Sequence, residues 1–247
     1  MPTKLHFLVT AGSTRQKIDD VRDWGNIFTG QTGLDLALAF LKLGNVTLLT
    51  SNTQHAQQYD GHKNMTVETF RSHEDLRALL MKRMMVLREE DRVDVVAMTA
   101  AVSDYNPEGT YRIVSKSLNA EERETWLVEN VSAGKVKSHF DEIAVRGIRT
   151  EKLIDLFRSI WNFKGTLIKF KLEVGISEEE LIKIATASRT ASDADLIVAN
   201  TLAMAKPTQG DGGGGAAYLI DNVETLRVAR GELAQRVANW VKAKRLT

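Results

Sequence analysis

The sequence of 247 residues predicts an α/β protein in which helices cover both faces of a mixed sheet. Short apolar runs alternate with segments of helical period, which indicates a mainly parallel sheet. Near the C-terminus, AAYLID followed by TLRVAR predicts an antiparallel hairpin, so the parallel strands are expected in the middle. The alternation stops between residues 105 and 150, and we expect this segment to be an excursion over the sheet edge.

Six runs rich in Val, Ile, Leu and Thr are the predicted strands of the main sheet. They are residues 4–10, 45–51, 65–70, 93–100, 165–173 and 194–200. With the hairpin they make a Rossmann-like, three-layer arrangement, and we expect residues 1–247 to form a single domain.

Four segments between or after these runs carry apolar residues at helical spacing. Their apolar faces are Leu34, Leu38 and Leu41; Leu76, Leu79, Leu80 and Leu87; Leu181, Ile184 and Ala185; and Leu233, Val237 and Trp240. Ser72 precedes the second helix, and Gly44 follows the first. Ser177 with Glu180 predicts a capping box at the start of the third.

Composition excludes several classes of function. A formal net charge of +1 argues against a nucleic-acid surface built on bulk charge. The absence of cysteine excludes disulfides, thiol nucleophiles and cysteine metal sites, and fits a reducing compartment. The N-terminal apolar run is too short for a membrane span and has no signal-peptide pattern, so we expect a soluble, cytoplasmic protein with no membrane partner.

The loop after the first predicted strand is unusually long. In the dinucleotide fingerprint, three glycines follow the first strand within about six residues. Here Gly12 is followed much later by Gly25, Gly30 and Gly33, and a loop of this length is usually functional. The stretch TGQTG can offer backbone N–H groups and a helix dipole to a phosphate, or it can simply permit a tight turn.

Ligands of open α/β sheets bind beyond the carboxyl ends of the strands, which makes residues in the following loops candidates. Asn26 serves turn geometry or donates its amide to an oxyanion formed during acyl transfer. Asp104 caps a helix or holds a ligand amine or hydroxyl. Lys135 and Lys137 alternate as on a strand, and either form a solvated face or bind a triphosphate.

The five histidines show no metal-ligand spacing, so a zinc site is not expected and no protein residue is assigned to a metal. Mg²⁺ stays open, because substrate phosphates often carry it with one or two carboxylates.

Six blocks in this order resemble phosphopantothenoylcysteine synthetase, also called phosphopantothenate–cysteine ligase, over nearly the whole chain. The blocks are VTAGSTRQKIDDVR, GNIFTGQTG, MTAAVSDY, GKVKS, FKLE and DLIVAN. The resemblance implies a two-step ligation in coenzyme A biosynthesis. The carboxylate of 4′-phosphopantothenate attacks the α-phosphate of CTP or ATP, and L-cysteine then displaces the nucleotide from the acyl-nucleotide. With the nucleotide we expect Mg²⁺.

The resemblance also implies partners. Family members are typically homodimers, and residues 105–150 are the expected contact region. The chain resembles the stand-alone form, so the phosphopantothenoylcysteine decarboxylase of the pathway is expected to be a separate protein.

Site residues carry over where the motifs match. Asn26 matches the asparagine that supports conversion of the acyl-nucleotide, and Lys135 matches the triphosphate-binding lysine. Ala100 and Ala101 match a close-packed alanine pair, which we assign to both the nucleotide and the acyl substrate.

The remaining matches concern the nucleotide. Asp104 matches a nucleotide-contacting aspartate, and Phe170 matches a phenylalanine beside the base. Gly12, Gly30 and Gly33 match the loop glycines of the family.

The sequence departs from the family pattern mainly in its cations. Members often read SSGKMG where this chain has FTGQTG, so Gln31 replaces a basic side chain near the phosphates. Many also carry lysines before the sixth strand, where TASRTASDAD leaves only Arg189, so the cations around Ser188 and Ser192 are lost. Because each lost cation weakens phosphate contacts, nucleotide choice and rate stay open.

Two alternatives remain at this point. One is an NAD(P)-binding Rossmann oxidoreductase, which TGQTG before a helix suits superficially; against it, the second strand ends in TSNTQ, without an acidic residue for the ribose hydroxyls. The other is a non-catalytic relative that binds nucleotide, which the missing cations motivate.

Overall fold

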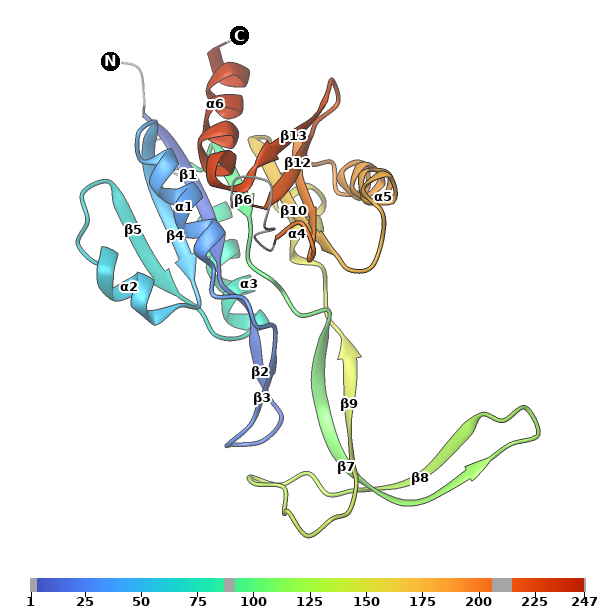
Figure 1. Ribbon diagram of the computed structural model, residues 1–247. Coiled ribbons are helices and arrows are strands. Elements are labelled where there is room, and N and C mark those ends of the chain that lie inside the picture. Colours follow the sequence, from blue (N-terminus) through green and yellow to red (C-terminus); the bar gives the residue numbers. More distant parts are fainter. Residues whose placement is uncertain (1–3, 87–91, 206–214, 247) are drawn as a thin grey trace.

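The structure is a computed structural model that describes residues 4–86, 92–205 and 215–246. The strands of its main sheet are β1 (Leu5–Ala11), β4 (Gly44–Thr50), β5 (Met65–Thr69), β6 (Val95–Met98), β10 (Thr166–Glu173), β11 (Leu196–Thr201), β12 (Ala216–Ile220) and β13 (Thr225–Ala229). They lie in the order β13-β12-β11-β10-β6-β1-β4-β5 (Figure 1). β12 pairs antiparallel with β11 and with β13, while the strands from β11 to β5 are parallel. The mixed, centrally parallel sheet is therefore confirmed.

Helices cover both faces of this sheet. The helices of the chain are α1 (Gln31–Phe40), α2 (Thr53–Tyr59), α3 (His73–Met84), α4 (Leu153–Ser159), α5 (Glu178–Ala191) and α6 (Leu233–Leu246). In β1, Phe7 and Val9 pack in one core cluster with α1 and α6, whereas Leu8 packs on the opposite face with α3 and α4. Alternate residues of a strand face opposite sides, which is why one short run supplies both cores.

The helix predictions hold in outline and differ in detail. The buried face of α1 contains Leu34 and Phe40, while the predicted Leu38 and Leu41 are only partly buried. A full capping box forms at Ser72, whereas Ser177 contributes its side-chain oxygen to the N–H of Glu180. The α3 pattern was expected to reach position 87, which lies outside the described residues.

Two small sheets extend from the carboxyl side of the main sheet. The long loop after β1 contains a hairpin of β2 (Arg15–Lys17) and β3 (Asp23–Gly25). Residues 105–149, which we call the arm, form β7 (Tyr105–Leu118), β8 (Glu124–Asn130) and β9 (Ile143–Arg149), with β7 in the middle.

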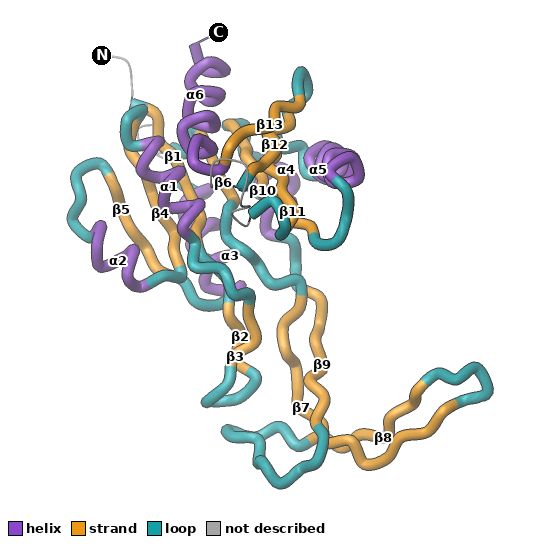
Figure 2. The backbone as a smooth tube through the Cα atoms, in the orientation of Figure 1, coloured by secondary structure: helices purple, strands orange, loops and turns teal. Residues whose placement is uncertain are grey.

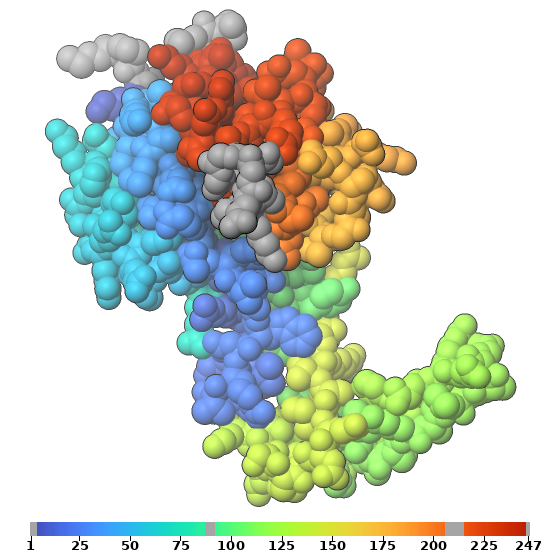
Figure 3. Space-filling view, in the orientation of Figure 1, coloured from blue at the N-terminus to red at the C-terminus, as the bar shows by residue number. Residues whose placement is uncertain are grey.

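The excursion is present, but it does not lie along the sheet edge. Figures 1 and 3 show the arm projecting away from the body of the molecule. Figure 2 shows the loops at this end of the sheet leading into both the hairpin and the arm. Within the described residues, no helix is long and apolar enough to span a membrane.

Candidate functional site

The chain reverses its direction of travel across the sheet between β1 and β6. From β1 it continues to β4 and β5 on one side, whereas β6, β10 and β11 follow on the other. In open α/β sheets this switch point leaves a crevice at the carboxyl ends of the strands. Here the N–H of Ala101 donates to the carbonyl of Gly12 at 2.9 Å, and the N–H of Thr14 donates to the carbonyl of Ala101 at 3.2 Å. The predicted residues Gly12 and Ala101 therefore meet at the switch point.

Gly30 brings the long loop back to the same place. Its φ of +87° is left-handed, and a Cβ at this position would lie 2.3 Å from the backbone nitrogen of Gly12. Gly33, in the first turn of α1, packs so closely that a Cβ would lie 2.4 Å from Thr99 Oγ1. The three predicted loop glycines thus gather around the first turn of α1.

A cavity of about 240 Å³, which we call the glycine cavity, opens beside this turn. Its lining includes Gly12, Gly30, Gln31, Thr32, Gly33, Thr99, Ala100, Ala101, Phe170, Lys171, Asn200, Arg230 and Leu233. The N-cap Gly30 has no side chain to cap α1, and the first turn holds no acidic residue. Its N–H groups and positive dipole end therefore suit an anion in this cavity.

A second cavity of about 290 Å³, which we call the amide cavity, adjoins the first. Asn26 lines it, half-buried, and its Nδ2 donates to the carbonyl of Ala101 at 3.1 Å. The hydroxyl of Ser13 donates to the backbone carbonyl of Asn26 at 2.9 Å, which fixes the loop. Ala100, Ala101 and Phe170 line both cavities. The amide of Asn26 is thus oriented next to the residues that separate the two spaces.

Asp104 lines the amide cavity from its outer side and is exposed. Its backbone carbonyl accepts the N–H of Thr150 at 2.9 Å, which joins the two ends of the arm. The structure therefore brings Asn26, Ala100, Ala101, Asp104 and Phe170 together in one region.

Lys169 lines the amide cavity and was missed in the sequence. It lies on β10, and its Nζ donates to Ser188 O and to Ser192 Oγ, both at 3.1 Å. Burial lowers the pKa of Lys169 below its ordinary value; the negative charge of Asp155 opposes this shift, and the positive charges of Lys152 and Lys171 add to it. A lysine flanked by the apolar residues Ile168 and Phe170 within the strand was the available signal. It places a cation where the sequence suggested that cations were lost.

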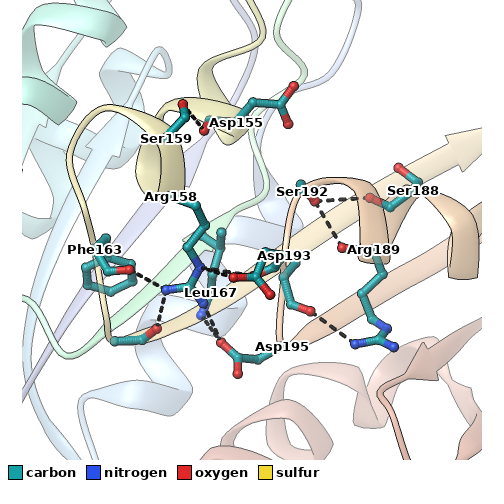
Figure 4. Close-up of polar contacts among 12 residues, drawn as sticks. Asp155, Arg158, Ser159, Phe163, Leu167, Ser188, Arg189, Ser192, Asp193 and Asp195 are labelled. Carbon is teal, nitrogen blue, oxygen red and sulfur yellow. Dashed lines mark hydrogen bonds and ion pairs between the residues drawn. The ribbon is translucent and has the colours of Figure 1, made fainter.

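Arg189, the cation that the sequence leaves in this region, does not line the amide cavity. Its Nη1 donates to Ala194 O at 3.2 Å, in the turn after α5. Figure 4 shows this turn and the neighbouring Arg158, whose Nη2 donates to Asp195 Oδ2 at 3.0 Å. The Nε of Arg158 also donates to Asp193 O at 3.0 Å, so α4 and the turn after α5 are held together behind the amide cavity.

Lys135 lies apart from the other predicted site residues. The strand expected for its segment is wrong: residues 131–142 form a loop between β8 and β9, and Lys135 is exposed there. It lines neither the glycine cavity nor the amide cavity. In the single chain, the structure does not bring Lys135 to Asn26.

The loop that carries Lys135 is tied to the long loop after β1. The buried carboxylate of Asp19 accepts the N–H of Val136 at 3.1 Å and the Nε of Arg22 at 3.0 Å. Arg22 Nη2 donates to Val136 O at 3.0 Å, and the N–H of Asp20 donates to Gly134 O at 2.8 Å. The Arg22 guanidinium holds the pKa of Asp19 well below its usual range. We call this group of contacts the clasp.

A third cavity, of about 810 Å³, lies beside the hairpin. Two of its charged residues pair with each other, since Arg71 Nη2 lies 2.8 Å from Asp23 Oδ2, and Asp75 caps α3. Among the described residues, no three His, Asp or Glu side chains are arranged to hold a metal ion.

Comparison with known proteins places this geometry in context. The model of the DNA/pantothenate metabolism flavoprotein C-terminal domain family matches residues 3–127. The Coenzyme A biosynthesis bifunctional protein CoaBC of Thermococcus kodakarensis is 30% identical over 197 residues, which cover 79% of this chain and 41% of that protein. The chain therefore spans less than half the length of this relative.

Solved structures share the fold. The DNA/pantothenate metabolism flavoprotein from Streptococcus pneumoniae superimposes with a TM-score of 0.76 at 26% identity, over 97% of this chain and 99% of that chain. A Cab2 mutant in complex with phosphopantothenate-cysteine has a TM-score of 0.64 at 14% identity, over 99% of this chain and 90% of that chain.

Proposed function

The chain belongs to the DNA/pantothenate metabolism flavoprotein C-terminal domain family, and from this premise we propose that it is a phosphopantothenate–cysteine ligase. It joins 4′-phosphopantothenate to L-cysteine in coenzyme A biosynthesis, with residues 1–247 acting as one domain. Its similarity to CoaBC, a coenzyme A biosynthesis protein, supports the pathway. The observation that carries the proposal is the Asn26 amide, which lines a cavity with room for an acyl group and is fixed on Ala101, a residue shared with the cavity suited to phosphate.

In the first step, a carboxylate oxygen of 4′-phosphopantothenate attacks the α-phosphorus of CTP or ATP. The bond from this phosphorus to the pyrophosphate oxygen breaks, and pyrophosphate leaves. The glycine cavity holds the nucleotide, with backbone N–H groups at Gly30 and α1 facing its phosphates and Phe170 beside its base. The chain contributes mainly orientation and charge stabilisation.

In the second step, the cysteine amine attacks the acyl carbon, and the bond from this carbon to the nucleotide oxygen breaks as the amine loses a proton. A primary amide has two N–H donors. In Asn26, one donates to Ala101 O, which leaves the other for the oxyanion that develops on the acyl group. This assigns Asn26 to amide formation rather than to nucleotidyl transfer.

Mg²⁺ fits this site as an ion carried by the nucleotide phosphates, which it would neutralise during nucleotidyl transfer. Asp104 offers an exposed carboxylate at the amide cavity. The other carboxylate there, Glu151, pairs with Arg77 at 2.9 Å. Asp104 is therefore our candidate protein ligand.

Lys135 is assigned to the triphosphate, but it lies outside the glycine and amide cavities and therefore must be brought to them. It reaches the phosphates either after the arm and its loop move or from a second copy of the chain. We propose a homodimer formed through the arm, whose apolar side chains are exposed, including Leu118, Trp126 and Leu127. A cytoplasmic location completes the proposal as a prediction from sequence.

The test is pyrophosphate release from 4′-phosphopantothenate, L-cysteine and Mg²⁺, with CTP and ATP in parallel. We expect release with at least one nucleotide, and none with either nucleotide would refute the ligase. In Asn26→Ala, the acyl-nucleotide should accumulate and amide formation should slow by about 10²–10³-fold, the usual cost of one oxyanion donor. Full turnover in this variant would remove Asn26 from its role.

The same assay decides between the alternatives. Tight nucleotide binding without acyl-nucleotide formation would identify a non-catalytic relative. An NAD(P) oxidoreductase has little support, because Ser51 and Asn52 follow β4 where an acidic residue would bind the ribose.

A further inference from the structure

Arg230 reaches the glycine cavity from the C-terminal part of the chain. It is the first residue of the short helix η2 (Arg230–Glu232). Its Nη2 lies 3.4 Å from Thr32 Oγ1, in the first turn of α1, and its Nη1 lies 3.4 Å from Ala205 O. Both distances are at the long end for N–H···O hydrogen bonds, so neither contact commits the guanidinium strongly.

The charges around this cavity single out Arg230. Among the described lining residues, only Lys171 and Arg230 are charged, and none is acidic. Lys171 Nζ is paired with Glu173 Oε1 at 3.0 Å. Within the described part of the chain, no carboxylate forms an ion pair with Arg230. Arg230 is thus the cation of this cavity that is most available to a ligand.

Gln31, the position at which the sequence lacks a basic side chain, lines the cavity, but its side-chain amide is engaged along the helix. Its Nε2 donates to Asp35 Oδ1 at 2.7 Å, one turn further along α1. It is uncharged and held along the outside of the helix. The first turn of α1 therefore receives its nearest positive side chain from η2 and not from its own sequence.

The core fixes Arg230 at this place. Its backbone N–H donates to Gly215 O at 2.7 Å. The following helix α6 packs on α1, with Leu233 and Val237 buried in the same cluster as Leu34 (Figure 1). Two segments from opposite ends of the chain are thus locked together, with the guanidinium at the mouth of the cavity.

We propose that Arg230 binds the phosphate chain of the nucleotide, as the cation that replaces the missing one at position 31. The planar guanidinium is positively charged and can donate to two phosphate oxygens in parallel, whereas Gln31 is neutral and its Nε2 already donates to Asp35. The identity of the nucleotide rests on the proposed function. The phosphate chemistry rests on the cavity and its charge.

The first test measures binding by calorimetry, with CTP, ATP and inorganic tripolyphosphate as separate probes. In Arg230→Gln, we expect the affinity for tripolyphosphate and for the preferred nucleotide to fall about 10- to 100-fold, as for loss of a charge-assisted contact. Arg236→Gln is the matched control, because Arg236 lies on α6 and pairs with Glu232 at 3.0 Å. Its affinities should stay at the wild-type level.

The second test moves the charge. Adding Gln31→Lys to Arg230→Gln places a cation on the first turn of α1, and we expect it to raise the affinity of Arg230→Gln for tripolyphosphate about tenfold. A purely structural Arg230 would give a lower melting temperature that Gln31→Lys does not repair. If Arg230→Gln folds poorly, Arg230→Lys takes its place in the test. This variant keeps the positive charge but loses the planar guanidinium, and it should bind tripolyphosphate with an affinity between those of wild type and Arg230→Gln.

These outcomes separate the inference from the ligase itself. Wild-type affinity of Arg230→Gln for tripolyphosphate would overturn the inference, and so would equal losses in Arg230→Gln and Arg236→Gln. A wild-type protein that binds none of the three probes would overturn it too. If wild-type protein binds tripolyphosphate through Arg230 but releases no pyrophosphate, the ligase fails and the phosphate site stands.

Discussion

At the scale of single residues, Gly30 occupies a position where the site has no room for a side chain. An alanine there meets two penalties: the left-handed backbone and a Cβ that would lie 2.3 Å from Gly12 N. Gly61 is the matched control, since its φ is +69° but nothing lies within 4 Å of its would-be Cβ. We expect Gly61→Ala to lower the free energy of unfolding by about 1–2 kcal/mol. Gly30→Ala should cost about 1–3 kcal/mol more and abolish pyrophosphate release. Equal losses in chemical denaturation would contradict the close approach.

Lys169 gives a prediction with a pH sign. Burial lowers its pKa in the folded protein below the ordinary 10.5, so the charged form of Lys169 destabilises the folded state at neutral pH. The free energy of unfolding should therefore rise as pH increases through the lowered pKa towards 10.5, where the unfolded chain still holds the proton. Lys169→Met should lose this rise. At neutral pH its unfolding free energy should stay within about 1 kcal/mol of wild type, because two lost hydrogen bonds oppose the relief of burial. Denaturation curves of wild type and Lys169→Met, measured from neutral pH to about pH 10.5, test this prediction. If the unfolding free energies of the two proteins change with pH in parallel, the lowered pKa of Lys169 is refuted.

At the scale of elements, the clasp joins two loops that are far apart in sequence. Arg22 lowers the pKa of Asp19, so the Asp19 carboxylate should stay ionised, and keep accepting the N–H of Val136, at pH values below the ordinary aspartate range. The contact should be lost only as pH falls through the lowered pKa. Asp19→Asn weakens these contacts at neutral pH. We expect faster hydrogen exchange in residues 134–137 and a reduced kcat with little change in the Michaelis constant for 4′-phosphopantothenate.

The neighbouring residue supplies the control for the clasp. Asp20 is exposed, and its side chain pairs only with Lys17 at 3.1 Å among the described residues. Asp20→Asn keeps the backbone contact to Gly134 and should exchange like wild type. If Asp19→Asn exchanges no faster than Asp20→Asn, the clasp does not hold the loop.

These elements show what the sequence can and cannot predict. The strands of the main sheet follow from local patterns, because each buried run carries its own apolar signal. Gly30 and Asn26 could be identified by motif, but their contacts with Gly12 and Ala101 depend on β1 and β6 lying side by side. The loop of Lys135 was taken for a strand because its exposed-buried-exposed pattern imitates one. That pattern instead comes from Val136 docking on the clasp, a tertiary contact with no local signature.

At the scale of the whole molecule, the arm exposes large apolar side chains to solvent. Every residue of β8 is exposed, and Leu118 and Leu127 are 69% and 62% exposed. A thin antiparallel sheet with apolar side chains in water is marginally stable and prone to pair. We therefore expect a second copy of the chain to cover it.

Light scattering after size exclusion tests the dimer. Wild-type protein should have the mass of two chains, and Leu127→Asp should shift it to one. Ile160→Asp is the control, because Ile160 is 66% exposed but follows α4 in the body of the molecule. A monomeric wild type, or a Leu127→Asp variant that stays dimeric, would show that the arm is not the contact.

Mixing two variants that are impaired in amide formation then tells which chain supplies Lys135. If Lys135 serves the site of the partner, a mixed dimer of Asn26→Ala and Lys135→Ala contains one site with both residues intact, because the asparagine of one chain meets the lysine of the other. Mixing should then restore amide formation. If Lys135 swings into the site of its own chain, each site of the mixed dimer lacks one residue, and amide formation stays at the level of the separate variants. The exposed position of Lys135, outside the described cavities of its own chain, favours the first result. Either result fixes whether the arm only joins two enzymes or completes each of them.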